Sequence, residues 1–155
     1  RGLRFVRYAD DVLIFTKSEM AANRVMESIS SWIERKLFLK INATKSKVVR
    51  PTRSKYLGFT FLKNGEQWKV KPTTEKKKAL YKKLSEYLKR GKAISRSLRV
   101  TIKRVNQMVV GWINYFRIGM MKQFMEEFGA WLRHKIRVIV INQWKKPKTI
   151  YRNLS

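Results

Sequence analysis

Asp10 and Asp11 are the two aspartates of this 155-residue chain, and they are adjacent in the sequence. Clustered carboxylates suit phosphoryl transfer assisted by two metal ions, which lie about 3.5–4 Å apart in such sites. Magnesium prefers oxygen ligands and leaves coordination positions open for substrate phosphates. The pair therefore predicts catalytic, metal-binding carboxylates with two Mg²⁺ ions as the cofactor. The alternative is an ordinary polar turn, in which aspartate is common.

Two short apolar runs, residues 3–8 and 12–15, flank the pair and are typical of strands. They predict a β-hairpin with the carboxylates at its tip. Ser18 is a candidate N-cap for a helix that follows, in which apolar residues from Ala22 to Leu37 recur at spacings of three and four. We expect this apolar stripe to be core that packs on the sheet carrying the hairpin.

A second hairpin is predicted over residues 56–70, with Asn64-Gly65 as a type I′ turn. Gly58 inside the first of its strands indicates a bulge or a close approach of the backbone. Beyond Pro72 and Thr73 the apolar periodicity becomes helical, around residues 80–88, 98–116 and 124–140. The fold class predicted is α+β: antiparallel hairpins with one packing helix, followed by an all-α three-helix bundle. Trp112, Phe116 and Trp131 fall on apolar stripes, which favours core packing over base stacking.

The net charge is +27, from 37 Lys and Arg against 10 Asp and Glu. Residues 1–72 hold 16 basic and 6 acidic residues, a net +10, and residues 73–155 hold 21 and 4, a net +17. Basic residues spread over the whole length favour a nucleic-acid partner over a membrane surface. No apolar run approaches the roughly 18 residues of a membrane span. The absence of cysteine excludes disulfides and thiolate metal sites.

Several motifs, in order, resemble those of reverse transcriptases, especially the enzymes encoded by group II introns. Tyr8-Ala9-Asp10-Asp11 is similar to the Tyr-Ala-Asp-Asp box, and Lys45-Ser46-Lys47 and Tyr56-Leu57-Gly58-Phe59 follow it as in that family, with Ser46 where threonine is usual. Residues 111–116 (Gly-Trp-Ile-Asn-Tyr-Phe) resemble the signature of the maturase-specific thumb, called domain X, and residues 143–149 resemble the stretch that closes it. The resemblance implies that residues 1–72 are the C-terminal part of the polymerase palm and residues 73–155 the thumb.

The resemblance also implies roles for single residues. Asp10 and Asp11 would coordinate metal beside the primer 3′ end, and Lys45 would assist the departing pyrophosphate. The residues expected to line the primer and nucleotide site are Tyr8, Ala9, Tyr56, Leu57 and Gly58. An ordinary strand with a bulge is the alternative for the last three, and a solvated surface lysine is the alternative for Lys45.

A thumb must hold a template–primer duplex through its phosphates, which requires Lys and Arg. The residues expected to bind nucleic acid are Lys76, Lys77, Lys83, Arg96, Arg99, Lys103 and Arg104. The resemblance adds intron RNA to the RNA template, DNA primer and dNTP as partners, and structured RNA is recognised largely by shape. About half of the basic helical residues are expected to be solvated faces only.

The function expected is that of an RNA-directed DNA polymerase, a nucleotidyltransferase of a mobile intron, that also assists RNA splicing. The family pattern needs one more carboxylate, and no candidate precedes Asp10, so we expect the chain to be an inactive piece of a longer, active enzyme. The alternatives are a non-intron bacterial reverse transcriptase, a splicing factor with a vestigial polymerase site, and a plain nucleic-acid-binding module. The expected location is the bacterial cytoplasm, or an organelle in a eukaryote, and the oligomeric state stays open.

Overall fold

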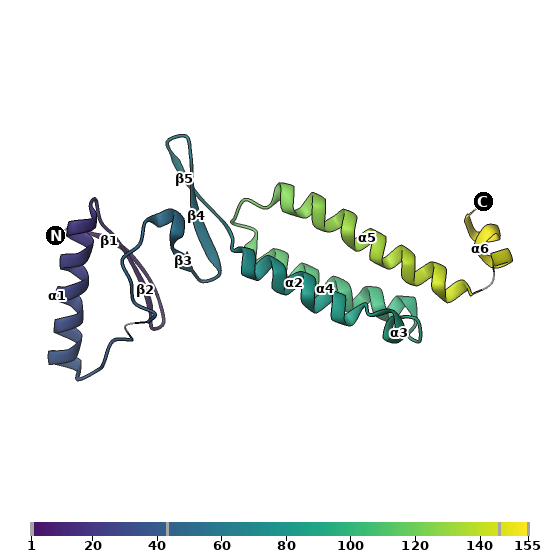
Figure 1. Ribbon diagram of the computed structural model, residues 1–155, viewed down its shortest axis with the longest axis horizontal. Helices are drawn as coiled ribbons and strands as arrows, with labels where there is room; N and C mark the ends of the chain where they lie inside the picture. The colour runs from purple at the N-terminus through teal and green to yellow at the C-terminus, as the bar shows by residue number, and fades with distance from the viewer. Residues whose placement is uncertain (1, 43, 146, 155) are drawn as a thin grey trace. The chain divides into compact units, whose positions relative to one another are not determined.

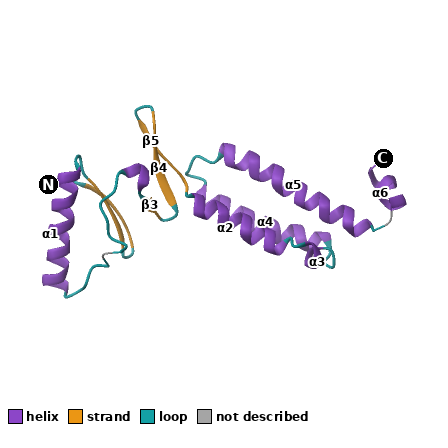
Figure 2. Ribbon diagram, viewed as in Figure 1, coloured by secondary structure: helices purple, strands orange, loops and turns teal. Residues whose placement is uncertain are grey.

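The computed structural model describes residues 2–42, 44–145 and 147–154, and it divides into two compact units, residues 1–56 and residues 57–155. Figure 1 labels the helices and strands, and Figure 2 shows that strands occur in both units while most helical residues lie in the second. The mixture of antiparallel hairpins and helices confirms the predicted α+β class. The boundary between compact units falls at Tyr56/Leu57, whereas the predicted family-domain boundary at residues 72/73 stays a prediction.

The first unit begins with the predicted hairpin. Strands β1 (Arg4–Tyr8) and β2 (Asp11–Phe15) pair antiparallel, with Tyr8 opposite Asp11 and a two-residue turn at Ala9 and Asp10. Helix α1 (Glu19–Leu37) follows, and the hydroxyl of Ser18 accepts a hydrogen bond from the Ala21 amide at 3.2 Å, which confirms the predicted N-cap. A 3₁₀ helix, η1 (Pro51–Arg53), and the short strand β3 (Lys55–Tyr56) complete the unit.

The prediction that the apolar stripe of α1 is core is wrong. No residue of α1 is buried, and Trp32 is 53% exposed. Val25, Met26 and Ile33 are half-buried on the stripe. The described part of the unit offers the 19-residue helix two strands of five residues each, which are too short to cover it.

The second unit begins with the second predicted hairpin, strands β4 (Phe59–Asn64) and β5 (Gln67–Pro72). Its turn differs from the prediction by one residue, because Asn64 pairs with Gln67 and the turn consists of Gly65 and Glu66. Gly65 has φ +61° and Asn64 is not left-handed. Positive φ at the first central position alone is typical of a type II′ turn, which takes glycine there, rather than of the predicted type I′.

The rest of the described chain is helical: it has the three long helices that were predicted and two short helices that were not. The long helices are α2 (Thr74–Tyr87), α4 (Leu98–Phe116) and α5 (Lys122–Trp144), and the short ones are α3 (Arg90–Ala93) and α6 (Pro147–Leu154). Thr73 caps α2, since its hydroxyl accepts a hydrogen bond from the Lys76 amide. The β4–β5 hairpin is joined to the turn after α4 by a hydrogen bond from the Met120 amide to the Val70 carbonyl, at 2.8 Å.

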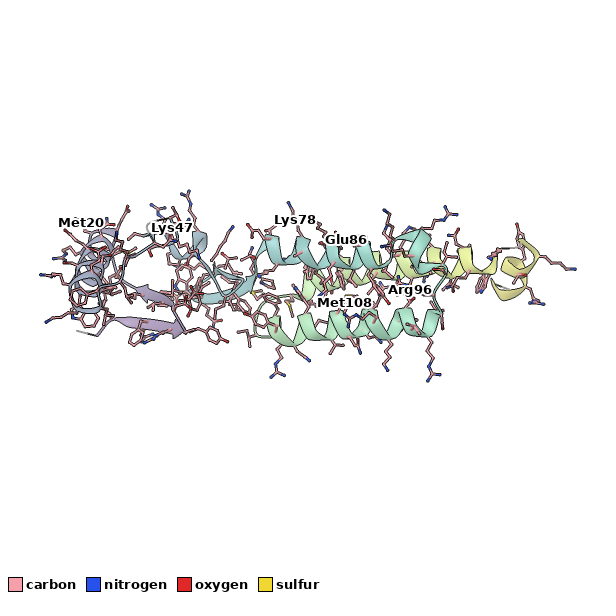
Figure 3. The ribbon with its side chains drawn as sticks, turned by 90° about the horizontal axis from the view of Figure 1, so that it is seen from below. Met20, Lys47, Lys78, Glu86, Arg96 and Met108 are labelled. Atoms are coloured by element: carbon pink, nitrogen blue, oxygen red, sulfur yellow. The ribbon has the colours of Figure 1, made fainter. Side chains whose placement is uncertain are left out.

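The hydrophobic core lies between α2, α4 and α5. Its buried side chains are Leu80, Leu84, Leu88, Ala93, Val105, Phe124, Phe128 and Ile139. Trp112 and Trp131 pack against them and Phe116 is buried, which confirms the preference for core packing over base stacking. Figure 3 shows Met108 on the side of α4 that faces α2.

One apolar residue of α4 lies outside the core. Ile102 is 37% exposed, while its neighbour Thr101 is 1% exposed. The buried face of α4 passes through Thr101, Val105, Met108 and Trp112, at spacings of four, three and four. A threonine therefore occupies a core position of α4, and the isoleucine beside it does not.

None of the described helices is both long enough and apolar enough to cross a bilayer.

Candidate functional site

The two aspartates occupy the tip of the β1–β2 hairpin, and both are exposed. Asp10 lies in the turn, whereas Asp11 is the first residue of β2 and pairs with Tyr8. Residues directly opposite each other in an antiparallel pair project to the same face, so Tyr8 and Asp11 share one face of the hairpin. Tyr8 is 66% exposed, which leaves its ring open to a ligand beside the carboxylate.

The turn is tight and left-handed at Ala9, which has φ +52°. Residues other than glycine seldom adopt this conformation, because their Cβ crowds the following carbonyl. Two side chains hold the turn: Arg7 Nε donates to the Ala9 carbonyl at 2.9 Å, and the Tyr56 hydroxyl donates to the Asp11 carbonyl at 3.2 Å. Tyr56, predicted to lie at the primer and nucleotide site, is thus joined directly to the backbone that carries the carboxylates.

The donor chemistry of the turn fits magnesium in part. Asp10 and Asp11 offer exposed carboxylate oxygens, and Mg²⁺ in phosphate-handling sites is commonly bound through one or two carboxylates, water and substrate phosphates. The described residues contain no group of three or more His, Cys, Asp or Glu side chains that could hold a metal ion. The turn therefore offers two exposed carboxylates, and their role as metal ligands stays a prediction.

Lys45 lies in a different segment of the first unit, in the chain between α1 and η1, and is exposed. The Asn42 side chain organises this segment, because its Oδ1 accepts hydrogen bonds from the amides of Thr44 and Lys45, at 3.0 and 3.2 Å. This is an Asx turn, which asparagine forms readily. The fold thus fixes the backbone of Lys45, and its predicted role in pyrophosphate departure stays a prediction.

Leu57 and Gly58 form a second strained turn, which belongs to the second unit. Both residues are left-handed, with φ +50° and +81°. A Cβ on Gly58 would lie 3.1 and 3.2 Å from side-chain carbons of Lys76 and 3.4 Å from the Phe116 ring. The predicted close approach at Gly58 is therefore real, and its neighbours are side chains of α2 and α4.

The predicted basic residues differ in their surroundings. Lys83, Arg99, Lys103 and Arg104 are exposed on α2 and α4. Lys76 is exposed as well, although its stem packs on Gly58. Their roles in nucleic-acid binding stay predictions.

Lys77 is half-buried, and its Nζ lies 4.9 Å from the centroid of the Phe124 ring. Burial, and then the neighbouring charge of Lys71, lower the pKa of Lys77, while Glu127 acts in the opposite direction. Part of this side chain therefore serves packing.

Arg96 makes contacts within the protein. Its guanidinium donates to the carbonyls of Tyr87 and Lys92 and lies 4.0 Å from the centroid of the Tyr87 ring. Figure 3 shows Arg96 beside the N-terminal end of α4. These bonds satisfy carbonyls at the ends of α2 and α3, which helices otherwise leave without partners. Whether Arg96 also contacts nucleic acid stays a prediction.

The contacts of Arg7, Asn42 and Tyr115 were not predicted from the sequence. Asn42 had a usable signal, since asparagine before a polar segment favours a turn. Tyr115 lies in the motif at residues 111–116, but its partner could not be predicted, because it is a backbone carbonyl 58 residues away. Arg7 likewise bonds to a backbone carbonyl, and no local pattern indicates that contact.

Comparison with known families gives two matches along the chain. Residues 1–61 match the family described as reverse transcriptase (RNA-dependent DNA polymerase). Residues 77–155, just over half of the chain, match the group II intron, maturase-specific domain. No curated protein was found to match. The two matches follow the same order as the hairpin that carries Asp10 and Asp11 and the basic helices of the second unit. The chain belongs to the group II intron reverse transcriptase and maturase family.

Proposed function

We propose that the chain carries part of the active site of a Mg²⁺-dependent RNA-directed DNA polymerase, together with a helical surface that binds intron RNA and the template–primer duplex. The observation that carries the proposal is the exposed Asp10-Asp11 turn, held from both sides, in a chain whose two family matches are a reverse transcriptase and a maturase-specific domain. Asp10 and Asp11 would hold the metal, which when bound supplies charge neutralisation for the attacking and leaving oxygens.

The residues of the chain orient these carboxylates. Arg7 and Tyr56 fix the carbonyls of Ala9 and Asp11, so the backbone at the turn has little freedom. Sites built on a constrained backbone hold their ligands with smaller deviations than sites on loose loops. Tyr8, on the face of Asp11, is placed to contact the nucleotide or the primer end.

The helices of the second unit would bind the backbone of nucleic acid. Their net charge favours polyanions at long range, and the exposed Lys83, Arg99 and Lys103 are free to approach phosphates. Each neutralised phosphate releases counterions, so binding should weaken steeply with salt.

The decisive experiment compares primer extension on an RNA template by a longer protein that contains this chain with extension by variants of that protein. Asp10→Asn and Asp11→Asn should each lower the rate by about 100-fold or more, because each removes charge from the metal site. Glu27→Gln, which removes an exposed carboxylate of α1 in the same unit, is the matched control and should keep full activity. Equal activity in all of these proteins would refute the metal-binding role.

A second experiment uses the 155-residue chain alone. With two carboxylates at the turn, we propose that it binds an RNA–DNA hybrid but does not extend the primer. Extension by the chain alone, abolished by Asp10→Asn, would overturn the second part of this proposal. Failure to bind either the hybrid or intron RNA at low salt would overturn the first.

A further inference from the structure

Strand β5 has a free edge, because among the described strands it pairs only with β4. The Val70 carbonyl accepts a hydrogen bond from the Met120 amide at 2.8 Å, so it points away from β4. Residues that point toward and away from the partner alternate along an antiparallel ladder, so Trp68 also directs its N–H and C=O to the free edge. Pro72 fits the same alternation, since proline has no N–H to donate to β4.

Three backbone groups at this edge are open. Among the described residues, no hydrogen bond occupies the N–H or C=O of Trp68 or the N–H of Val70. The segment after α4 bonds to the edge once, through Met120. Unpaired groups on an edge strand are a template for a further strand.

An apolar cavity of about 330 Å³ borders the free edge. Its lining includes Trp68, Val70, Ile118 and Met120. Three of these side chains are exposed, Trp68 by 52%, Ile118 by 75% and Met120 by 48%. Exposed apolar side chains gathered at one place mark a surface for interaction. The cavity can therefore take apolar side chains of a strand added at the edge.

The charge of β5 indicates what kind of strand fits. Side chains alternate along a strand, so Trp68 and Val70 lie on the cavity face, whereas Lys69 and Lys71 lie on the opposite face. No Asp or Glu occurs in residues 67–72. Opposite charges on neighbouring strands stabilise their pairing. A strand with apolar side chains on one face and carboxylates on the other matches both faces.

Other occupants match this edge less well. A second copy would bring Lys69 and Lys71 of two β5 strands together, in a chain of net charge +27, and like charges across a strand pair are destabilising. Nucleic acid would match the lysines, but its phosphates only accept hydrogen bonds. A peptide backbone supplies donors and acceptors at the spacing of the strand, as the open N–H and C=O of Trp68 require.

We propose that the free edge of β5 binds an extended segment of a partner protein in which apolar residues alternate with Asp or Glu. The segment would add a strand to the β4–β5 hairpin through the open groups of Trp68 and Val70. Its apolar side chains would enter the cavity, and its carboxylates would lie near Lys69 and Lys71. This interaction goes beyond the proposed function, because its partner is a protein and not a nucleic acid.

The test uses the 155-residue chain and a blocked, fluorescein-labelled peptide of three Glu-Ile repeats, with binding followed by anisotropy. A peptide of the same composition with its glutamates and isoleucines in separate blocks has equal charge but no alternation. It should bind at least about fivefold more weakly, because it cannot place apolar and acidic side chains on opposite faces. The alternating peptide should also slow amide exchange at Trp68 and Val70, whose N–H groups gain partners.

Two variants test the cavity and the edge separately. Ile118→Ser removes an exposed side chain of the cavity and should weaken peptide binding about fivefold to tenfold. Val100→Ser, at a 56%-exposed position of α4, is the matched control and should bind as the wild type does. Val70→Pro removes one outward N–H, leaves the ladder to β4 intact, and should weaken binding at least about fivefold. Because Ile118 is exposed, Ile118→Ser carries the test if Val70→Pro disturbs the hairpin.

Several results would overturn the proposal. Equal binding of the two peptides, unchanged binding by Ile118→Ser, or unprotected amides at Trp68 and Val70 would each do so. Protection of these amides by a six-nucleotide RNA, without binding of the alternating peptide, would assign the edge to nucleic acid. Dimerisation of the chain that Ile118→Ser abolishes would assign it to a second copy. Binding of the RNA–DNA hybrid, measured separately, decides the proposed function whatever the peptide does.

Discussion

The same substitution at two buried threonines of the second unit should change the free energy of unfolding in opposite directions. Thr101, in the core face of α4, is 1% exposed, and its hydroxyl has no hydrogen-bond partner among the described residues. Thr73 is 4% exposed, and its hydroxyl caps α2 by accepting from the Lys76 amide. Replacement by valine keeps the branched shape of each side chain and removes only the hydroxyl.

The expected magnitudes follow from what each hydroxyl does. A buried polar group without a partner costs about 1–3 kcal/mol, and a methyl group in its place adds apolar burial, so Thr101→Val should raise the free energy of unfolding by about 1.5 kcal/mol. Loss of an N-cap typically costs about 1 kcal/mol, so Thr73→Val should lower it by that amount. The two variants should therefore differ by about 2.5 kcal/mol.

The assay is urea unfolding of the 155-residue chain, followed by helical ellipticity at 222 nm. With slopes of about 1–3 kcal/mol per molar urea, the midpoints of the two variants should lie about 1–2 M apart, on opposite sides of the wild type. The slopes should stay equal, because neither variant changes the surface exposed on unfolding.

Each threonine has one outcome that would contradict the role given to its hydroxyl. A lower midpoint for Thr101→Val would mean that the hydroxyl is satisfied, for example by a buried water molecule. An unchanged midpoint for Thr73→Val would mean that the cap contributes nothing to the stability of α2. The two conclusions are independent, since each substitution is read against the wild type.

Three further predictions concern the turns, the basic residues and pH. Gly58→Ala should destabilise the second unit more than Gly65→Ala, as measured by their urea midpoints. Both glycines are left-handed, which costs alanine about 1–2 kcal/mol, but a Cβ meets close neighbours only at Gly58. Arg99→Ala should lower the slope of hybrid affinity against salt concentration by about the contribution of one phosphate and leave the free energy of unfolding unchanged. Arg96→Ala should lower the free energy of unfolding by about 2 kcal/mol, because it loses its carbonyl and ring contacts. The reverse pattern would contradict these assignments. Because burial lowers the pKa of Lys77 in the folded protein, the folded state releases that proton before the unfolded chain, and stability should rise with pH up to the ordinary value of 10.5. Lys77→Met should remove that rise and be more stable at neutral pH, and parallel pH profiles of the two proteins would refute the assignment.

Patterns of residue type predicted the elements well. Two short apolar runs around Asp10 and Asp11 located the first hairpin, and the periodic apolar residues located α1, α2, α4 and α5. These signals succeed because strand and helix periods are properties of the local backbone. The turn types were less predictable. Ala9 and Leu57 are left-handed although neither residue favours that conformation, and what holds them is contacts from elsewhere in the fold.

The details of the candidate site depended on contacts that no local pattern contains. A basic residue looks the same in sequence whether it is exposed, as Arg99 is, or bonded to helix carbonyls, as Arg96 is. Similarly, an aromatic residue such as Tyr115 is placed by periodicity on one face of a helix, but its bond to the Leu57 carbonyl spans 58 residues. Tertiary partners of this kind require the fold itself.

The distribution of the core has a consequence for local unfolding. Every buried hydrophobic side chain of the core, among the described residues, lies between Phe59 and Ile139. Amide hydrogens of α2, α4 and α5 should therefore exchange with solvent only through global opening, whereas those of β1, β2 and α1 should exchange through smaller and more frequent openings. The carboxylates of Asp10 and Asp11 thus lie in a unit whose strands and helix contribute no buried hydrophobic side chain to the core. A ligand that binds this turn should therefore slow amide exchange at Asp11 at concentrations too low to change the unfolding of the helices.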